Sequence, residues 1–200
     1  STLLYHDNFD KQSNMYTQAI ARKNKLTSFL RENNYERLSK RPNVTIYTGM
    51  GSFVSPNTVK VVLSEEEIEL QGKEIFINTG STPIIPNIEG IQQSRNVYTS
   101  TTLLDLDILP KHLIIIGGGY IGLEFASMYA GFGSKVTILE IGNRFMPRND
   151  SDIAKSIREV MEKKGIEIRL NVRTQSIHDT HDGVTLTYSD TSDGTPYFVD

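Results

Sequence analysis

The feature that most limits the fold of this chain lies between residues 113 and 122. Four apolar residues, Leu113–Ile116, have the length of a short buried strand, and the glycine-rich stretch Gly117–Gly122 follows at once. A run that is apolar at every position is typical of a central parallel strand covered on both faces. The glycines then predict a tight turn at the end of that strand.

A helix and a second strand are predicted to follow the glycine turn. Apolar side chains recur there at helical spacing, on Ile121, Phe125, Met128 and Phe132. Gly131 and Gly133 can end this helix. Residues 135–140 form the second strand, and its last residue is an acid, Glu140, about 20 residues beyond the glycines. This order of strand, turn, helix, strand and acid predicts the βαβ unit of a dinucleotide-binding fold.

Each part of the unit has a physical task. Gly117 permits the tight turn, Gly119 lets a pyrophosphate approach the backbone, and Gly122 lets the helix pack closely on the strand. The helix N-terminus offers unpaired N–H groups and a partial positive charge to the phosphates. Glu140 can accept hydrogen bonds from the ribose hydroxyls. The alternative is a glycine-rich turn that binds no ligand.

The predicted NAD-binding residues are Gly117, Gly118, Gly119, Tyr120, Ile121, Gly122 and Glu140. A carboxylate beside a 2′-phosphate is repulsive, so Glu140 favours NAD over NADP. Arg144 and Arg148 lie just beyond and could instead receive a phosphate, or they could be surface charges. From the pattern alone, Tyr120 could equally face the nicotinamide or pack. For Glu124 a favourable acid near a helix N-terminus is the simpler interpretation.

The rest of the chain divides into recognisable segments. Residues 12–33 are predicted to form a helix, and residues 43–78 a small β-meander that includes strands at 44–47 and 74–77. Prolines disfavour helix through most of residues 82–110, and a domain boundary is expected between about 95 and 110. A helix beginning near Asp150 or Ser151, a strand at 166–170 and a hairpin at 174–188 complete the prediction.

Composition excludes several classes of function. The net charge is −3, which gives no basic excess for nucleic acid, and no apolar run has the ~20 residues of a membrane span. There is no cysteine in the 200 residues, so they contain neither a disulfide nor a thiolate nucleophile. This fits a cytoplasmic origin. The four histidines are scattered without metal-ligand spacing, and no metal site is predicted.

The residues Gly117–Ala126 resemble the second dinucleotide motif of the class I pyridine nucleotide-disulfide oxidoreductases, the family of glutathione reductase, dihydrolipoamide dehydrogenase and mercuric reductase. Ile75–Pro83 is similar to the strand and Thr-Gly turn that close the FAD domain of this family. Pro86–Gly90 and Ser100–Thr101 are similar to its crossover to the NAD domain. Within this family, the sequence of these segments is most similar to the reactive-chlorine-resistance branch, which has hypothiocyanous acid reductase-like members.

The resemblance supplies roles by position. It implies that Tyr120 is an aromatic gate over the flavin, and that Glu124 lies near the flavin and nicotinamide. Gly51 would offer its backbone to the FAD adenine, and Thr79 and Gly80 would border the FAD. No catalytic residue is expected within the chain itself; Tyr120 and Glu124 would support the reaction.

The resemblance also implies that the chain is an internal fragment. The family begins with an FAD-binding strand, its own GxGxxG and a C-x4-C redox pair, and residues 2–4 align just past those cysteines, with Ser1 where a lysine would stand. The family continues beyond residue 200 with the last NAD-domain strand, an FAD-binding Gly-Asp and a dimer domain. We therefore expect no reductase turnover from these residues alone.

The fold class that follows is α/β: a Rossmann-like NAD-binding domain with a parallel sheet, attached to a partial FAD-binding domain. Residues 1–100 are assigned to the FAD domain and residues 101–200 to an incomplete NAD domain. The resemblance implies a cytoplasmic homodimer that passes hydride from NADH to FAD and then electrons to a small-molecule or small-protein oxidised acceptor. A flavin-linked NADH oxidase without a dithiol and a non-catalytic dinucleotide-binding module stay open as alternatives.

Overall fold

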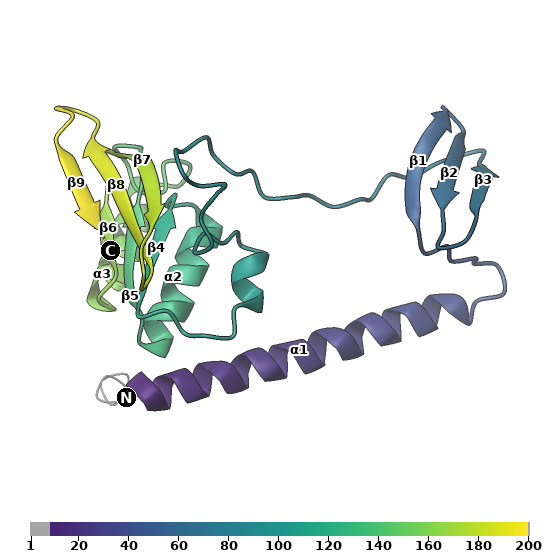
Figure 1. Ribbon diagram of the computed structural model, residues 1–200, viewed down its shortest axis with the longest axis horizontal. Coiled ribbons are helices and arrows are strands. Elements are labelled where there is room, and N and C mark those ends of the chain that lie inside the picture. The colour runs from purple at the N-terminus through teal and green to yellow at the C-terminus, as the bar shows by residue number, and fades with distance from the viewer. Residues whose placement is uncertain (1–8, 200) are drawn as a thin grey trace. The chain divides into compact units, whose positions relative to one another are not determined.

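The computed structural model describes residues 9–199 (Figure 1). Contacts within the chain divide it into two units. The first unit holds the residues up to Arg22 and those from Pro83 onward, and the second holds Lys23–Thr82. The boundaries between the two units fall at residues 22–23 and 82–83 of the chain. The expected assignment of residues 1–100 to an FAD domain and of residues 101–200 to an NAD domain stays a prediction. No described helix is long and apolar enough to cross a membrane.

The first unit is built around a parallel sheet with helices between its strands. The strands lie in the order β4-β5-β6, and each is joined to the next by one helix, so the predicted βαβ unit is confirmed. The elements of this region are β4 (His112–Ile116), α2 (Tyr120–Phe132), β5 (Lys135–Leu139), α3 (Ser151–Lys163) and β6 (Glu167–Arg169).

The expectation that Leu113–Ile116 forms a central strand is wrong for the described residues. β4 lies at the edge of the sheet and β5 at its centre. The side chains of β4 are accordingly half-buried, and Ile116 is 42% exposed. An apolar run indicates a strand, but it does not reveal how many neighbours that strand has.

Both faces of β5 are buried. Val136 and Ile138 belong to a core cluster with residues of α2 and α3, whereas Leu139 belongs to a second cluster. That second cluster includes residues of a second sheet, antiparallel and ordered β7-β8-β9. Its strands are β7 (Val172–Asp179), β8 (Val184–Asp190) and β9 (Pro196–Val199). The hairpin expected at 174–188 is confirmed, and β9 was not predicted.

The connector before β4 belongs to the first unit. Glu89 pairs with Ser176 of β7 in a parallel bridge, and the Ile177 N–H donates to the Glu89 carbonyl at 2.8 Å. A short 3₁₀ helix (Thr102–Asp105) follows. The chain between residues 89 and 105 is therefore attached to the fold that carries β4.

The first part of helix α1 (Phe9–Ser39) also packs in the first unit. Tyr16 and Tyr129 of α2 are almost fully buried, and their hydroxyl oxygens lie 2.8 Å apart. Burial raises the pKa of both phenols. The predicted helix is longer than expected, and its buried face carries Gln12 and Tyr16.

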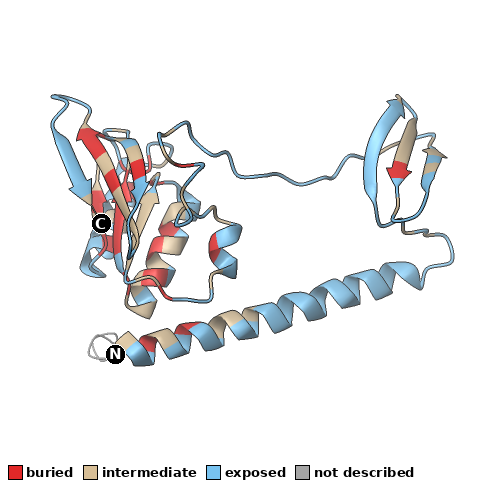
Figure 2. Ribbon diagram, in the orientation of Figure 1, coloured by how far each residue is buried: buried red, intermediate tan, exposed pale blue. Residues whose placement is uncertain are grey.

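The second unit is mostly exposed (Figure 2). It holds the rest of α1 and an antiparallel meander of β1 (Met50–Ser55), β2 (Thr58–Val62) and β3 (Glu67–Gln71). Residues 44–47 and 74–77, which were predicted as strands, are irregular. Val61 is the one buried large apolar residue among the described residues of this unit.

Candidate dinucleotide site

The glycine turn leaves β4 in a conformation that only glycine adopts readily. Gly117 has φ 103°, in the left-handed region, so any side chain there is strained. Its N–H donates to the Leu139 carbonyl of β5 at 2.8 Å. The turn is thus fixed at the carboxyl edge of the parallel sheet, where ligands of open α/β sheets bind.

Gly119 and Gly122 have different surroundings. A Cβ added at Gly122 would lie 2.5 Å from the Gly117 carbonyl oxygen and 3.2 Å from Ile115 Cγ2. No side chain fits between helix and strand at that point. A Cβ at Gly119 would meet nothing within 4 Å. Gly119 therefore faces open space, where a ligand can approach the backbone.

Helix α2 begins without a side-chain cap. Its N-cap residue is Gly119, which has no side chain that could accept a hydrogen bond from the N–H groups of the first turn. The first N–H groups of a helix lack intrahelical partners, and the helix dipole places partial positive charge there. Together with the open space at Gly119, this end of α2 fits a phosphate.

Glu140 follows β5 directly and lies against the glycine turn. Its Oε2 accepts the N–H of Gly118 at 2.8 Å, and its Oε1 accepts the N–H of Gly142 at 2.8 Å. Each carboxylate oxygen has a second lone pair, so the group can still accept hydrogen bonds from hydroxyls. Two backbone donors thus hold a half-buried carboxylate at fixed orientation beside the open helix end.

Tyr120 and Ile121 point away from the core. Their side chains are 61% and 59% exposed, and Glu124 is exposed one turn further along α2. The Tyr120 hydroxyl donates to Asn149 Oδ1 at 2.8 Å. Sequence reasoning did not identify Gly142 or Asn149, because neither belongs to a recurring motif.

Arg144 and Arg148 lie in the same loop as Gly142 and Asn149. Both are exposed, and neither forms an ion pair with another residue that the structure describes. Their position between β5 and α3 keeps them as candidates to meet a phosphate.

The three residues assigned to FAD lie in the second unit. Gly51 is on β1, whereas Thr79 and Gly80 lie in an exposed stretch without regular secondary structure. A Cβ at Gly51 would make only an ordinary contact with Val59, at 3.7 Å, and one at Gly80 would meet nothing within 4 Å. Their assignment to an FAD site stays a prediction.

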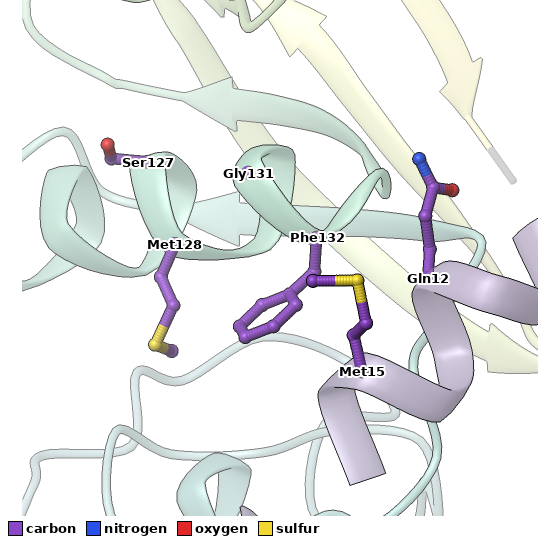
Figure 3. Close-up of a pocket in the computed structure, with 6 residues that line it drawn as sticks. All are labelled: Gln12, Met15, Ser127, Met128, Gly131 and Phe132. Carbon is purple, nitrogen blue, oxygen red and sulfur yellow. The ribbon is translucent and has the colours of Figure 1, made fainter. Parts of the chain in front are cut away.

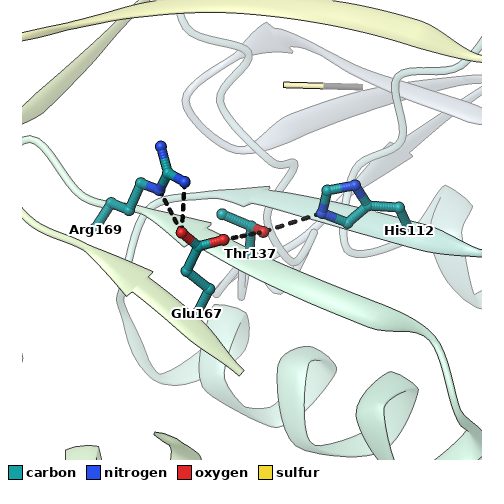
Figure 4. Close-up of polar contacts among 4 residues, drawn as sticks. All are labelled: His112, Thr137, Glu167 and Arg169. Carbon is teal, nitrogen blue, oxygen red and sulfur yellow. Dashed lines mark hydrogen bonds and ion pairs between the residues drawn. The ribbon is translucent and has the colours of Figure 1, made fainter. Parts of the chain in front are cut away.

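A polar chain crosses the parallel sheet (Figure 4). His112 Nε2 lies 3.0 Å from Thr137 Oγ1, and this hydroxyl contacts Glu167 Oε2 at 3.2 Å. Arg169 Nε donates to the other Glu167 oxygen at 2.6 Å. Burial alone would raise the pKa of Glu167, but the hydrogen bond and charge of Arg169, aided by Thr137, hold it below its usual value.

A cavity of about 350 Å³ lies between α1 and α2 (Figure 3). It is lined by Gln12, Met15, Ser127, Met128, Gly131 and Phe132. These residues include no acid or base, so the cavity offers apolar contact and no chemistry. No group of three or more His, Cys, Asp or Glu that could hold a metal ion occurs among residues 9–199.

Comparison with known proteins identifies the family. The family model described as pyridine nucleotide-disulphide oxidoreductase matches residues 4–200. The chain belongs to this family. It is 45% identical over 174 residues to the probable pyridine nucleotide-disulfide oxidoreductase RclA of Escherichia coli, an alignment that covers 87% of this chain and 39% of that protein. It is 40% identical to dihydrolipoyl dehydrogenase of Geobacillus stearothermophilus, over 76% of this chain and 32% of that protein.

Solved structures agree with the sequence relatives. The chain resembles the Cu(II) complex of the HOCl-induced flavoprotein disulfide reductase RclA from Escherichia coli with a TM-score of 0.84 and 40% identity. That match covers 96% of this chain and 43% of the other. The predicted family, branch and α/β fold are therefore confirmed. The chain spans well under half the length of these relatives.

Proposed function

We propose that residues 117–122 and Glu140 bind the dinucleotide NADH for an FAD-dependent oxidoreductase. The observation that carries this proposal is the contact between the Glu140 carboxylate and the Gly118 N–H, which joins the two halves of the motif at 2.8 Å. The N–H groups at the start of α2 can bind a phosphate, and the adjacent carboxylate can accept hydrogen bonds from ribose hydroxyls.

The residues of this chain would bind and orient the cofactors. The first N–H groups of α2 would bind the pyrophosphate, and the absence of a side chain at Gly119 would leave space for it. Glu140 would accept hydrogen bonds from the hydroxyls of the adenosine ribose. Tyr120 and Glu124 would lie toward the nicotinamide. Bound FAD would supply the redox chemistry, as hydride acceptor.

Beyond the site itself, the proposal extends to the whole enzyme. Gly51, Thr79 and Gly80 would contribute to the FAD site of the complete protein. Its electrons would pass to a disulfide-type or other oxidised acceptor, and it would act as a cytoplasmic homodimer. The names of the relatives support this class of reaction.

The test uses the complete flavin-loaded enzyme under anaerobic conditions. Addition of NADH should bleach the oxidised flavin absorbance. Glu140→Ala and Gly119→Val should weaken NADH binding, because the first removes the ribose acceptor and the second fills open space at the phosphate position. Gly183→Ala, at the distant β7–β8 turn where a Cβ meets nothing, is the matched control.

Different failures separate the alternatives. Flavin reduction by NADH without reduction of any disulfide would indicate a flavin-linked oxidase lacking a dithiol. NAD binding without a flavin would indicate a non-catalytic dinucleotide module. NADH-dependent turnover by residues 1–200 alone, above a buffer control, would contradict the expectation that this stretch is inactive by itself.

A further inference from the structure

The short connection between β6 and β7 holds the segment that carries the proposed ribose-binding acid. The Glu140 N–H donates to the Arg169 carbonyl at 2.8 Å, and the Glu140 carbonyl accepts the Val172 N–H at 3.1 Å. Between these two bonds, the Asn171 N–H donates to the Gly142 carbonyl at 3.0 Å. Backbone hydrogen bonds from this connection therefore fix the main chain of Glu140 and that of the residue two places beyond it.

Gly142 is the residue through which the connection reaches the carboxylate of Glu140. The Gly142 N–H donates to Oε1 at 2.8 Å, and Oε2 accepts the Gly118 N–H, also at 2.8 Å. Gly142 is thus bonded on both sides, by its N–H to the carboxylate and by its carbonyl to Asn171. A shift of the connection would move the N–H that orients Oε1, whereas the bond from Gly118 does not depend on it.

The backbone of Asn171 is left-handed. Its φ is 57°, and among the described residues other than glycine only Met146 also has a positive φ. The Asn171 N–H donates to Gly142, while its carbonyl accepts the Thr191 N–H from the β8–β9 connection at 2.7 Å. Its side chain makes no hydrogen bond to a described residue, so the backbone alone provides these contacts. Asparagine enters this region more readily than most residues, and such outliers often lie beside functional sites.

We propose that Asn171 is a positioning residue that acts through Gly142 to fix the Glu140 carboxylate, and so sets the preference for NADH over NADPH. This inference rests on the proposed function. A carboxylate held at both oxygens accepts the ribose hydroxyls without further ordering, and it cannot turn away from a 2′-phosphate. A carboxylate released at Oε1 would have to be ordered by NADH and could rotate away from the phosphate, which lowers the repulsion.

The experiment follows flavin reduction in the complete flavin-loaded enzyme by anaerobic stopped flow, with NADH and with NADPH. This half-reaction needs no electron acceptor, and it separates the apparent Kd from the limiting rate constant. Asn171→Ala and Asn171→Val introduce residues that disfavour a positive φ, the β-branched valine most strongly. Asn171→Gly keeps the left-handed conformation and removes only the side chain.

The expected result is a change in selectivity that follows the backbone preference of the new residue. In Asn171→Ala the Kd for NADH should rise, and the ratio of the NADPH Kd to the NADH Kd should fall about threefold, because the net contribution of one hydrogen bond corresponds to a factor of roughly 2 to 10. The ratio should fall further in Asn171→Val and stay at the wild-type value in Asn171→Gly. The limiting rate constants should not change, since the adenosine ribose is remote from the nicotinamide. The alanine variant decides the question if the valine variant does not fold.

Two further variants separate positioning from general strain. Gly165 has φ 80° and lies before β6, at the edge of the sheet opposite Glu140, and a Cβ there would meet nothing within 4 Å. Gly165→Ala is therefore the matched control, because it strains the backbone in the same way and should leave the ratio unchanged. In a Glu140→Ala background, Asn171→Ala should alter the ratio no further, because Asn171 acts through that carboxylate.

The results distinguish the role of Asn171 from the function on which it rests. An unchanged ratio in Asn171→Ala, a fall in Asn171→Gly, an equal fall in Gly165→Ala, or an additive effect with Glu140→Ala would each overturn the positioning role. Absence of flavin reduction by NADH in the wild type, or a ratio that Glu140→Ala does not change, would instead overturn the proposed function of this site.

Discussion

Strands β5 and β2 each lie at the centre of a three-stranded sheet, yet they are buried to very different extents. Val136, Ile138 and Leu139 of β5 are at most 2% exposed, whereas Val62 of β2 is 39% exposed beside the buried Val61. Parallel strands need a crossover, and in this chain the crossovers are helices that cover the sheet. The meander is joined by short turns that bring no cover with them.

The difference in burial between the two sheets shows how far each segment can form its own apolar core. The βαβ region brings enough chain to bury its own central strand and to place Gly118 and Glu140 together. The second unit leaves Phe53, Phe76 and Ile77 exposed at 52%, 87% and 71%. The described residues of that unit therefore bury little of their own apolar surface.

The largest expected effect comes from removing core side chains in each unit. Ile138→Ala should lower the free energy of unfolding of the intact protein by about 2–5 kcal/mol, because Ile138 is fully buried. Val61→Ala, its counterpart in the second unit, should have a smaller effect because its surroundings are open. Denaturant titration gives the size, and hydrogen exchange assigns the loss to a unit. Equal losses would contradict the comparison.

A second prediction concerns close backbone packing. Gly122→Ala should lower the free energy of unfolding by about 1–3 kcal/mol, because its Cβ would meet the Gly117 carbonyl, which cannot move without distorting the turn. Gly51→Ala in β1 should be nearly neutral, since the added Cβ makes only an ordinary contact. Thermal unfolding of both variants measures this contrast. A destabilised Gly51→Ala protein would show that the meander is packed as tightly as the βαβ unit.

The sequence predicted the βαβ unit well because its signals are local. Gly117 needs a positive φ, Gly122 needs close approach, and Glu140 follows a strand, so the order of residues alone implied their arrangement. Helix α2 ends at Phe132 with Gly133 as its C-cap, and Gly133 is one of the two glycines that the sequence offered for this role. The family resemblance, confirmed by the comparisons, carried the argument from fold to reaction class.

Other features depend on distant chain and were missed. Ile121 and Met128 fit a helical stripe, yet they are exposed, and Leu123, Ala126 and Tyr129 are buried instead. The predicted apolar face is rotated about the helix axis from the face that is buried. The sequence of the helix alone does not indicate which face packs against β5 and α1. Asn149 likewise carries no local signal, since its contact with Tyr120 spans 29 residues.

A third prediction tests the site at the end of the buried strand. In the complete enzyme NADH should exceed NADPH by at least about 10-fold in kcat/KM, because a 2′-phosphate removes a hydroxyl donor and brings like charge toward Glu140. Glu140→Ala should narrow this ratio, mainly by weakening NADH, and should leave the core intact. Steady-state kinetics with both donors gives the answer. An unchanged ratio in Glu140→Ala would mean that Arg144 or Arg148 governs the choice.

The smallest expected effect compares an acid in each unit. The folded-state pKa of Glu167 is depressed, so its contribution to stability is present above its unfolded pKa of about 4.3 and is lost as the pH falls through the folded pKa. The stabilisation should stay below about 1 kcal/mol, because the Glu167 side chain is 39% exposed and solvent screens the pair with Arg169. Glu67 of β3 forms a more exposed pair with Lys60, at 3.4 Å.

Glu167→Gln should therefore reduce the free energy of unfolding slightly at neutral pH and flatten its decline as the pH falls from neutral to below the unfolded pKa of about 4.3. Glu67→Gln should leave the free energy of unfolding at neutral pH nearly unchanged, because the Glu67 side chain is 59% exposed. Denaturant titrations across that pH range measure both variants beside the wild type. If Glu167→Gln left the acid dependence unchanged, the polar chain across β4, β5 and β6 would contribute no more to stability than the exposed pair of the meander, and the advantage of the first unit would reside in its apolar core alone.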